Sequence, residues 1–74
     1  MKNKLKNILQ LLNPNCIVLI TNERFVIIYD DILCEAYHGE FNSKSIYVYN
    51  SKIGQRYIKN DLEKCFPELV IIVM

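Results

Sequence analysis

Three tyrosines and an arginine are the residues of this sequence best suited to holding a ligand. Tyr47 and Tyr49 lie two positions apart, so a strand would place both rings on one face. Tyr57 joins them there if its segment pairs with theirs, and Arg56 is its neighbour. Stacked rings beside a cation can hold a nucleobase and its phosphate. We therefore expect a nucleotide-like ligand site formed by Tyr47, Tyr49, Arg56 and Tyr57.

The same tyrosine face has a second interpretation. Arg56 has the parity of Ile58, so it would reach a ligand held by the rings only across a subunit boundary. Tyrosine also combines a rigid apolar ring with a polar tip, which suits protein interfaces. We favour an aromatic cluster at an oligomer interface or on a sheet surface over a pocket closed within one chain.

Cys34 and His38 are the one Cys–His pair close in sequence, with Glu35 and Glu40 nearby. On a helix, positions i and i+4 would point the same way and suggest zinc or a thiolate–imidazole pair. A structural zinc site needs four ligands, and no second Cys/His pair exists. Nucleophilic catalysis needs an orienting group and an oxyanion hole, which no residue identifies. We expect no metal site and no catalytic residue.

No motif in the sequence points to a cofactor. Gly39 and Gly54 are its two glycines, which excludes a P-loop and a dinucleotide fingerprint. The signatures GxSxG, HExxH and those of kinases are absent. Adjacent Asp30 and Asp31 are typical of a turn. We expect no cofactor and no enzymatic activity.

Length and charge limit the class of protein. The 74 residues suffice for a single domain, which we assign to residues 1–74. A net charge of +1 lacks the basic excess of nucleic-acid binders. The longest apolar run, residues 69–74, is far shorter than the about 20 residues of a membrane span. Three cysteines far apart, with no signal-peptide cleavage site, favour reduced thiols. We expect a cytoplasmic protein with no membrane or nucleic-acid partner.

The first 30 residues predict a helix and a hairpin. Residues 16–20 and 25–29 are rich in β-branched and aromatic residues, and a polar segment joins them, so we expect a β-hairpin that is apolar on both faces. The Asn13-Pro14-Asn15 segment ends the preceding element. That element is an amphipathic helix, whose apolar residues at helical spacing are Leu5, Ile8, Leu9 and Leu12.

The middle of the chain is harder to assign. Alternation over residues 32–41 favours a third strand, with a short helix as the alternative. Residues 45–49 alternate cleanly and predict a strand. If the next five residues close a hairpin to residues 55–58, Ile46 pairs with Ile58 and Tyr47 with Tyr57.

The last 15 residues complete the fold class. Asn60 and Glu63 resemble a capping box, which predicts a short helix that ends before Pro67. Residues 69–73 form a final strand with no polar face. We expect an α+β fold with an N-terminal helix, a small, mostly antiparallel sheet of about five strands, and a second short helix before the C-terminal strand.

The apolar content predicts self-association. Hydrophobic residues make up 51% of the chain, and several strands are apolar on both sides. Two short helices cover one face of such a sheet and leave the other bare. A second copy of the chain is the simplest cover, so we expect a homo-oligomer. The alternative is a sheet that curls on itself as a small barrel.

The opening of the chain resembles short proteins encoded by phages and prophages of low-GC Gram-positive bacteria. The resemblance covers about the first 30 residues and lies in residues 5–15 (LKNILQLLNPN), followed by residues 17–20 (IVLI) and a polar turn. It implies an accessory protein of a mobile element. Such proteins are often counter-defence factors, which sequester nucleotide immune signals or cover a surface of a host nuclease.

These observations lead to three functional hypotheses. The first is a non-enzymatic binding module that captures a nucleotide-like ligand at the boundaries of a homo-oligomer. The second is an inhibitor or adaptor that binds a host protein, and a purely structural protein is a further alternative. An enzyme acting through Cys34 and His38 ranks last.

Overall fold

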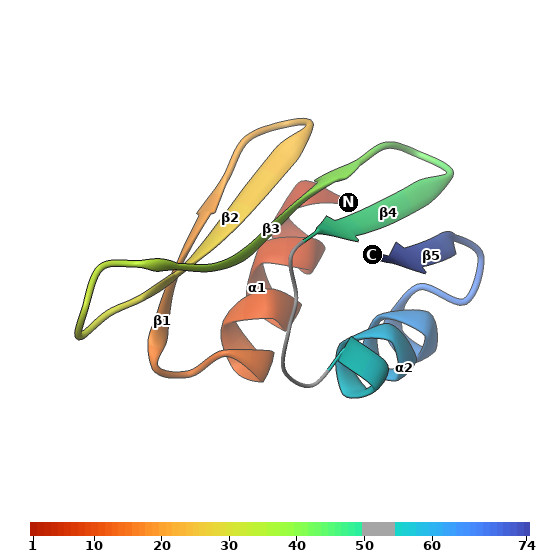
Figure 1. Cartoon of the computed structure of the whole chain (residues 1–74). Coiled ribbons are helices and arrows are strands. Elements are labelled where there is room, and N and C mark those ends of the chain that lie inside the picture. The colour runs from red at the N-terminus through yellow and green to blue at the C-terminus, as the bar shows by residue number, and fades with distance from the viewer. Residues whose placement is uncertain (50–54) are drawn as a thin grey trace.

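The fold was obtained as a computed structural model, which describes residues 1–49 and 55–74, and the side chains of residues 1–49 and 58–74. It is the α+β arrangement expected from the sequence, with a helix at each end of a run of four strands and a last strand after the second helix (Figure 1). In chain order the elements are α1 (Lys2–Leu12), β1 (Cys16–Ile20), β2 (Arg24–Tyr29), β3 (Glu35–Phe41), β4 (Ser45–Tyr49), α2 (Gln55–Cys65) and β5 (Val70–Val73).

The five strands form one sheet in the order β1-β2-β3-β4-β5. The first three pairings are antiparallel, and β4 and β5 run parallel. Parallel neighbours need a crossover connection, and α2 lies within the one between β4 and β5. Among the described strands, β1 and β5 are the two edges and do not pair. The sheet is therefore open, and the alternative of a small barrel is wrong.

The predicted hairpin between residues 45–49 and 55–58 is wrong. Strand β4 lies between β3 and β5, so Tyr47 faces Glu40 and Ile72 across the sheet rather than Tyr57. The residues expected as a strand begin α2 instead. The expected five-residue loop, residues 50–54, lies outside the described residues.

Helical spacing explains this correction. Ile58, Leu62 and Phe66 are each four residues apart, and all three are buried in the core. The four residues 55–58 alone fit a strand as well as a helix. They are too few to show the helical period that continues through Leu62. Asn60 lies inside the helix, so the predicted capping box is wrong as well.

Helix α1 and the three strands after it confirm the sequence interpretation. Leu5 and Leu9 of α1 are fully buried against the sheet. Strands β1 and β2 form the expected hairpin, in which Thr21 Oγ1 accepts hydrogen bonds from the turn amides of Glu23 and Arg24. The strand preferred for residues 32–41 begins at Glu35.

No helix in the described parts of the chain is long and apolar enough to cross a membrane.

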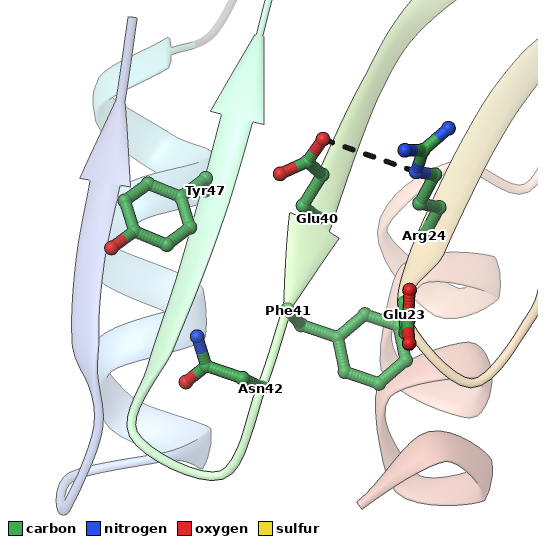
Figure 2. Close-up of a pocket in the computed structure, with 6 residues that line it drawn as sticks. All are labelled: Glu23, Arg24, Glu40, Phe41, Asn42 and Tyr47. Atoms are coloured by element: carbon green, nitrogen blue, oxygen red, sulfur yellow. Dashed lines mark ion pairs between the residues drawn. The ribbon is translucent and has the colours of Figure 1, made fainter.

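Both helices pack on the same face of the sheet. The core cluster joins Leu5 and Leu9 of α1 and Leu62 of α2 to strand residues such as Ile27 and Ile46. In Figure 2 both helices lie behind the strands, on the side away from the labelled Tyr47 side chain. One thin layer of helices thus covers one face, which we call the covered face.

Lys4 holds the two helices together. Its Nζ donates a 2.7 Å hydrogen bond to the carbonyl oxygen of Cys65 at the end of α2. The same ammonium lies 4.6 Å from the centroid of the Phe66 ring. A cation at a helix C-terminus and over an aromatic ring is favourable in both contacts.

Candidate binding face

The opposite side of the sheet, which we call the open face, carries no helix in the described parts of the chain. Side chains alternate between faces along each strand, so burial and register identify its members. They are Ile17, Leu19, Arg24, Val26, Ile28, Glu35, His38, Glu40, Tyr47, Tyr49, Val70 and Ile72.

The β1–β2 end of the open face is an aliphatic patch. Across this hairpin Ile17 lies opposite Ile28, and Leu19 lies opposite Val26. Ile17 is 37% exposed and Leu19 is 53% exposed. Cross-strand aliphatic pairs usually lie against other protein, so the patch is a candidate contact surface.

Three aromatic rings continue the patch toward β5. His38 is the register partner of Tyr49, and their ring centroids are 5.5 Å apart with planes at 28°. Tyr47 follows along β4, with its centroid 6.5 Å from that of Tyr49 and the two planes at 10°. Glu35 fixes the start of the row, since its Oε2 lies 2.9 Å from Nδ1 of His38. We call His38, Tyr49 and Tyr47 the aromatic row.

A shallow pocket of about 260 Å³ borders the aromatic row. Figure 2 shows its lining residues, which come from the β2–β3–β4 part of the sheet and the adjoining turns. Across the pocket Arg24 Nε lies 3.9 Å from Glu40 Oε1, and the two side chains are 74% and 52% exposed. Such an exposed pair is loose and open to another partner. The lining residues are Glu23, Arg24, Glu40, Phe41, Asn42 and Tyr47.

Asn42 is the rigid part of the pocket rim. Its Oδ1 accepts hydrogen bonds from the amides of Lys44 and Ser45 and from the Ser45 hydroxyl, at 2.8, 3.0 and 3.2 Å. An asparagine that bonds the backbone two residues on forms a local turn and fixes its own side chain. The β3–β4 turn therefore holds Tyr47 and the pocket rim in a set geometry.

The sequence-predicted site residues divide into two pairs. Tyr47 and Tyr49 do lie together on the open face, as their spacing predicts. Arg56 and Tyr57 belong to α2, which packs on the covered face, and their side chains lie outside the described residues. The expected pairing of Tyr47 with Tyr57 is thus wrong, because the hairpin that would bring the four residues together does not form.

Sequence reasoning did not place four polar residues on the open face, namely Arg24, Glu35, His38 and Glu40. His38 and Glu40 alternate with the buried Tyr37, Gly39 and Phe41 along β3. For a strand over residues 35–41, this alternation alone indicates that His38 and Glu40 share the face opposite the buried residues. Arg24 gave no such signal, because its partnership with Glu40 depends on the pairing of β2 with β3.

Cys34 and His38 do not form the arrangement considered for metal or nucleophilic chemistry. Cys34 precedes β3 and is exposed, whereas the His38 ring nitrogen is engaged by Glu35. Within the described parts of the chain, no group of three His, Cys, Asp or Glu side chains could hold a metal ion. Burial, with help from Asp31 and Asp30, raises the pKa of the Cys16 thiol, so this cysteine is a poor nucleophile.

Comparison with known proteins finds no relative: no family model matches the chain, and no curated protein or solved structure matches it.

Proposed function

We propose that the protein is a non-enzymatic binding module that self-associates through its open face. The observation that carries the proposal is the aliphatic patch next to the aromatic row on the open face. Apolar surface of this kind gains free energy when it leaves water, by about 25 cal/mol for each Å². A second copy of the chain has an identical apolar surface, so contact between the two open faces removes both surfaces from water.

A stable dimer would need nearly the whole of the open face. Five strands spaced about 4.8 Å apart, with four to seven residues each at about 3.3 Å per residue, give a footprint of roughly 24 by 18 Å. The accessible area of projecting side chains exceeds that footprint. A standard protein interface buries about 800 Å² on each partner. Most of the open face must therefore be covered if a stable dimer forms on it.

The charges of the open face favour protein over a polyanion. Among the described side chains, Arg24 is its cation, while Glu35 and Glu40 are anions. Nucleic acid would require several Lys or Arg side chains along such a surface. Apolar and aromatic side chains with few, mixed charges are typical of protein interfaces.

Oligomeric state tests the proposal. Sedimentation equilibrium at micromolar concentration should show a dimer for the wild type and a monomer for Leu19→Glu, which places a charge in the aliphatic patch. Leu11→Glu is the matched control, because Leu11 is 80% exposed on α1 and lies off the open face. It should remain dimeric. A monomeric wild type would contradict the proposal.

A nucleotide-like ligand is the second candidate, and the aromatic row favours it. Tyr47 and Tyr49 present nearly parallel rings, and Arg24 supplies the cation that Arg56 was expected to supply. This version fits the mobile-element accessory role that the resemblance implies. Titration calorimetry with cyclic and ADP-ribose-derived nucleotides should give heat that Tyr47→Ala abolishes and Tyr29→Ala, off the open face, leaves intact. No heat with any nucleotide would remove this candidate.

A further inference from the structure

We propose that two copies pack face to face about a twofold axis that runs along the strands between β2 and β3. The inference rests on the proposed self-association and specifies its geometry. Aligned sheets pack with their strand directions within about 30° of each other, so an in-plane axis lies within about 15° of the strands of each copy. The question is where on the open face this axis falls.

The Arg24–Glu40 pair locates the axis. These residues are register partners on β2 and β3, on either side of the line between the two strands. Rotation about that line places Arg24 opposite the partner's Glu40, and Glu40 opposite the partner's Arg24. Each loose surface pair thereby becomes part of a four-charge group with alternating signs. Both side chains are more than half exposed, so they are free to reach across.

The same rotation matches the apolar side chains. Strand β1 then lies over the partner's β4, which sets Leu19 against the partner's Tyr49. Strand β2 lies over the partner's β3, which sets Val26 against the partner's His38. Continuous register across four strands joins Leu19, Val26, His38 and Tyr49 in one row. The rotation therefore places this row against the same row of the partner in the opposite order. The rotation thus sets two members of the aliphatic patch against two rings of the partner's aromatic row. Ile28, one level further along β2, lies over the partner's Glu35.

Other placements of the axis fit less well. An axis on β2 would set Arg24 against its own copy, and one on β3 would set Glu40 against its own copy. An axis across the strands at the middle of β3 would place Glu35 opposite the partner's Glu40. An axis between β1 and β2 would pack the aliphatic patch on itself but leave β3, β4 and β5 outside the interface. Two strands of each copy would then overlap instead of four, which is about half the area.

Charge reversal tests the axis directly. In Arg24→Glu, the new carboxylate faces the partner's Glu40, and in Glu40→Arg the new guanidinium faces the partner's Arg24. Each variant alone should self-associate about tenfold to a hundredfold more weakly than the wild type, because two attractions become repulsions. In a mixture, both cross-chain pairs regain opposite signs. Native mass spectrometry should therefore show a heterodimer at a concentration at which neither variant dimerises alone.

The controls separate this inference from the proposed function. The charge clash inside each variant chain persists on mixing, so recovery must come from contacts between chains. Glu63→Arg on the exposed side of α2 should leave the wild-type dimer unchanged. Suppose that the wild type is dimeric, but that either charge-reversal variant dimerises as strongly as the wild type or that mixing the two variants gives no heterodimer. The proposed axis is then overturned, while self-association through the open face stands. A monomeric wild type removes both.

Discussion

The side-chain amide of Asn13 joins the end of α1 to the covered face of the sheet: its Nδ2 donates a 2.7 Å hydrogen bond to the hydroxyl of Tyr37. The same Nδ2 lies 2.7 Å from the carbonyl oxygen of Leu9, and the Asn13 backbone amide also donates to that oxygen. Tyr37 is buried in the core. One residue thus caps the helix and satisfies a buried hydroxyl.

Burial raises the pKa of Tyr37 to about 12, and the hydrogen bond from Asn13 offsets part of the increase. Because the folded-state pKa lies above the unfolded one, the stabilisation is fully present below about pH 10 and is lost as the pH rises toward 12. The loss amounts to about 2 to 3 kcal/mol. Urea unfolding across pH 9 to 12 should show this decline, and Tyr37→Phe should remove it. Tyr29→Phe, which removes an exposed tyrosine, should keep the decline.

Asn13→Ala should lower the free energy of unfolding by about 2 kcal/mol, because the helix loses its cap and the buried Tyr37 hydroxyl loses its donor. In a Tyr37→Phe background the hydroxyl no longer needs a partner, so the same substitution should cost about 1 kcal/mol less. Denaturant unfolding of the four proteins gives this coupling. Additive losses would show that the hydrogen bond contributes no stability.

Local periodicity explains how much of this fold the sequence predicts. Helix α1 and the β1–β2 hairpin each carry an apolar pattern longer than one helical turn, which is why the sequence predicts them. The structure confirms both assignments. The start of α2 could not be assigned in the same way, since residues 55–58 fit two periods and tertiary burial of Ile58 decides between them.

The candidate site divides along the same line. Tyr47 and Tyr49 are two residues apart on one strand, so their shared face follows from the sequence alone. The contact of Arg24 with Glu40 joins strands separated by a long turn, and register between strands is set by the whole sheet. Local spacing therefore finds the two tyrosines of the open face and misses its charges.

Gly39 is required by the packing of Phe25. A Cβ at position 39 would collide with the Phe25 ring on the covered face and with the backbone oxygen of Tyr47 on the neighbouring strand. Gly39→Ala should therefore cost about 3 kcal/mol in the free energy of unfolding, since one obstacle is backbone and cannot rotate away. Ser43→Ala, in the exposed β3–β4 turn, is the control and should stay within about 0.5 kcal/mol of the wild type. An equally small effect of Gly39→Ala would contradict this packing.

Leu33 occupies a backbone conformation that suits glycine. Its φ is 55° in the turn between β2 and β3, where its amide donates to the Tyr29 carbonyl oxygen, and its side chain is 71% exposed. A left-handed conformation costs a leucine roughly 1 to 2 kcal/mol, and little packing offsets that cost here. Leu33→Gly should thus raise the free energy of unfolding by about 1 kcal/mol, measured in urea. Ile32→Gly at the adjacent exposed position has no such strain to release and should be neutral or destabilising.

The three cysteines should differ in their rates of alkylation. Cys34 is exposed just before β3, whereas Cys16 and Cys65 are half-buried. Burial and the carboxylates of Asp31 and Asp30 raise the pKa of Cys16, which lowers its thiolate fraction at pH 8. Iodoacetamide labelling followed by peptide mass spectrometry should show Cys34 modified first and Cys16 far more slowly. Cys34→Ser should remove the fast phase and leave the slow one, and rapid labelling of Cys16 in the folded protein would show that β1 opens far more readily than its burial implies.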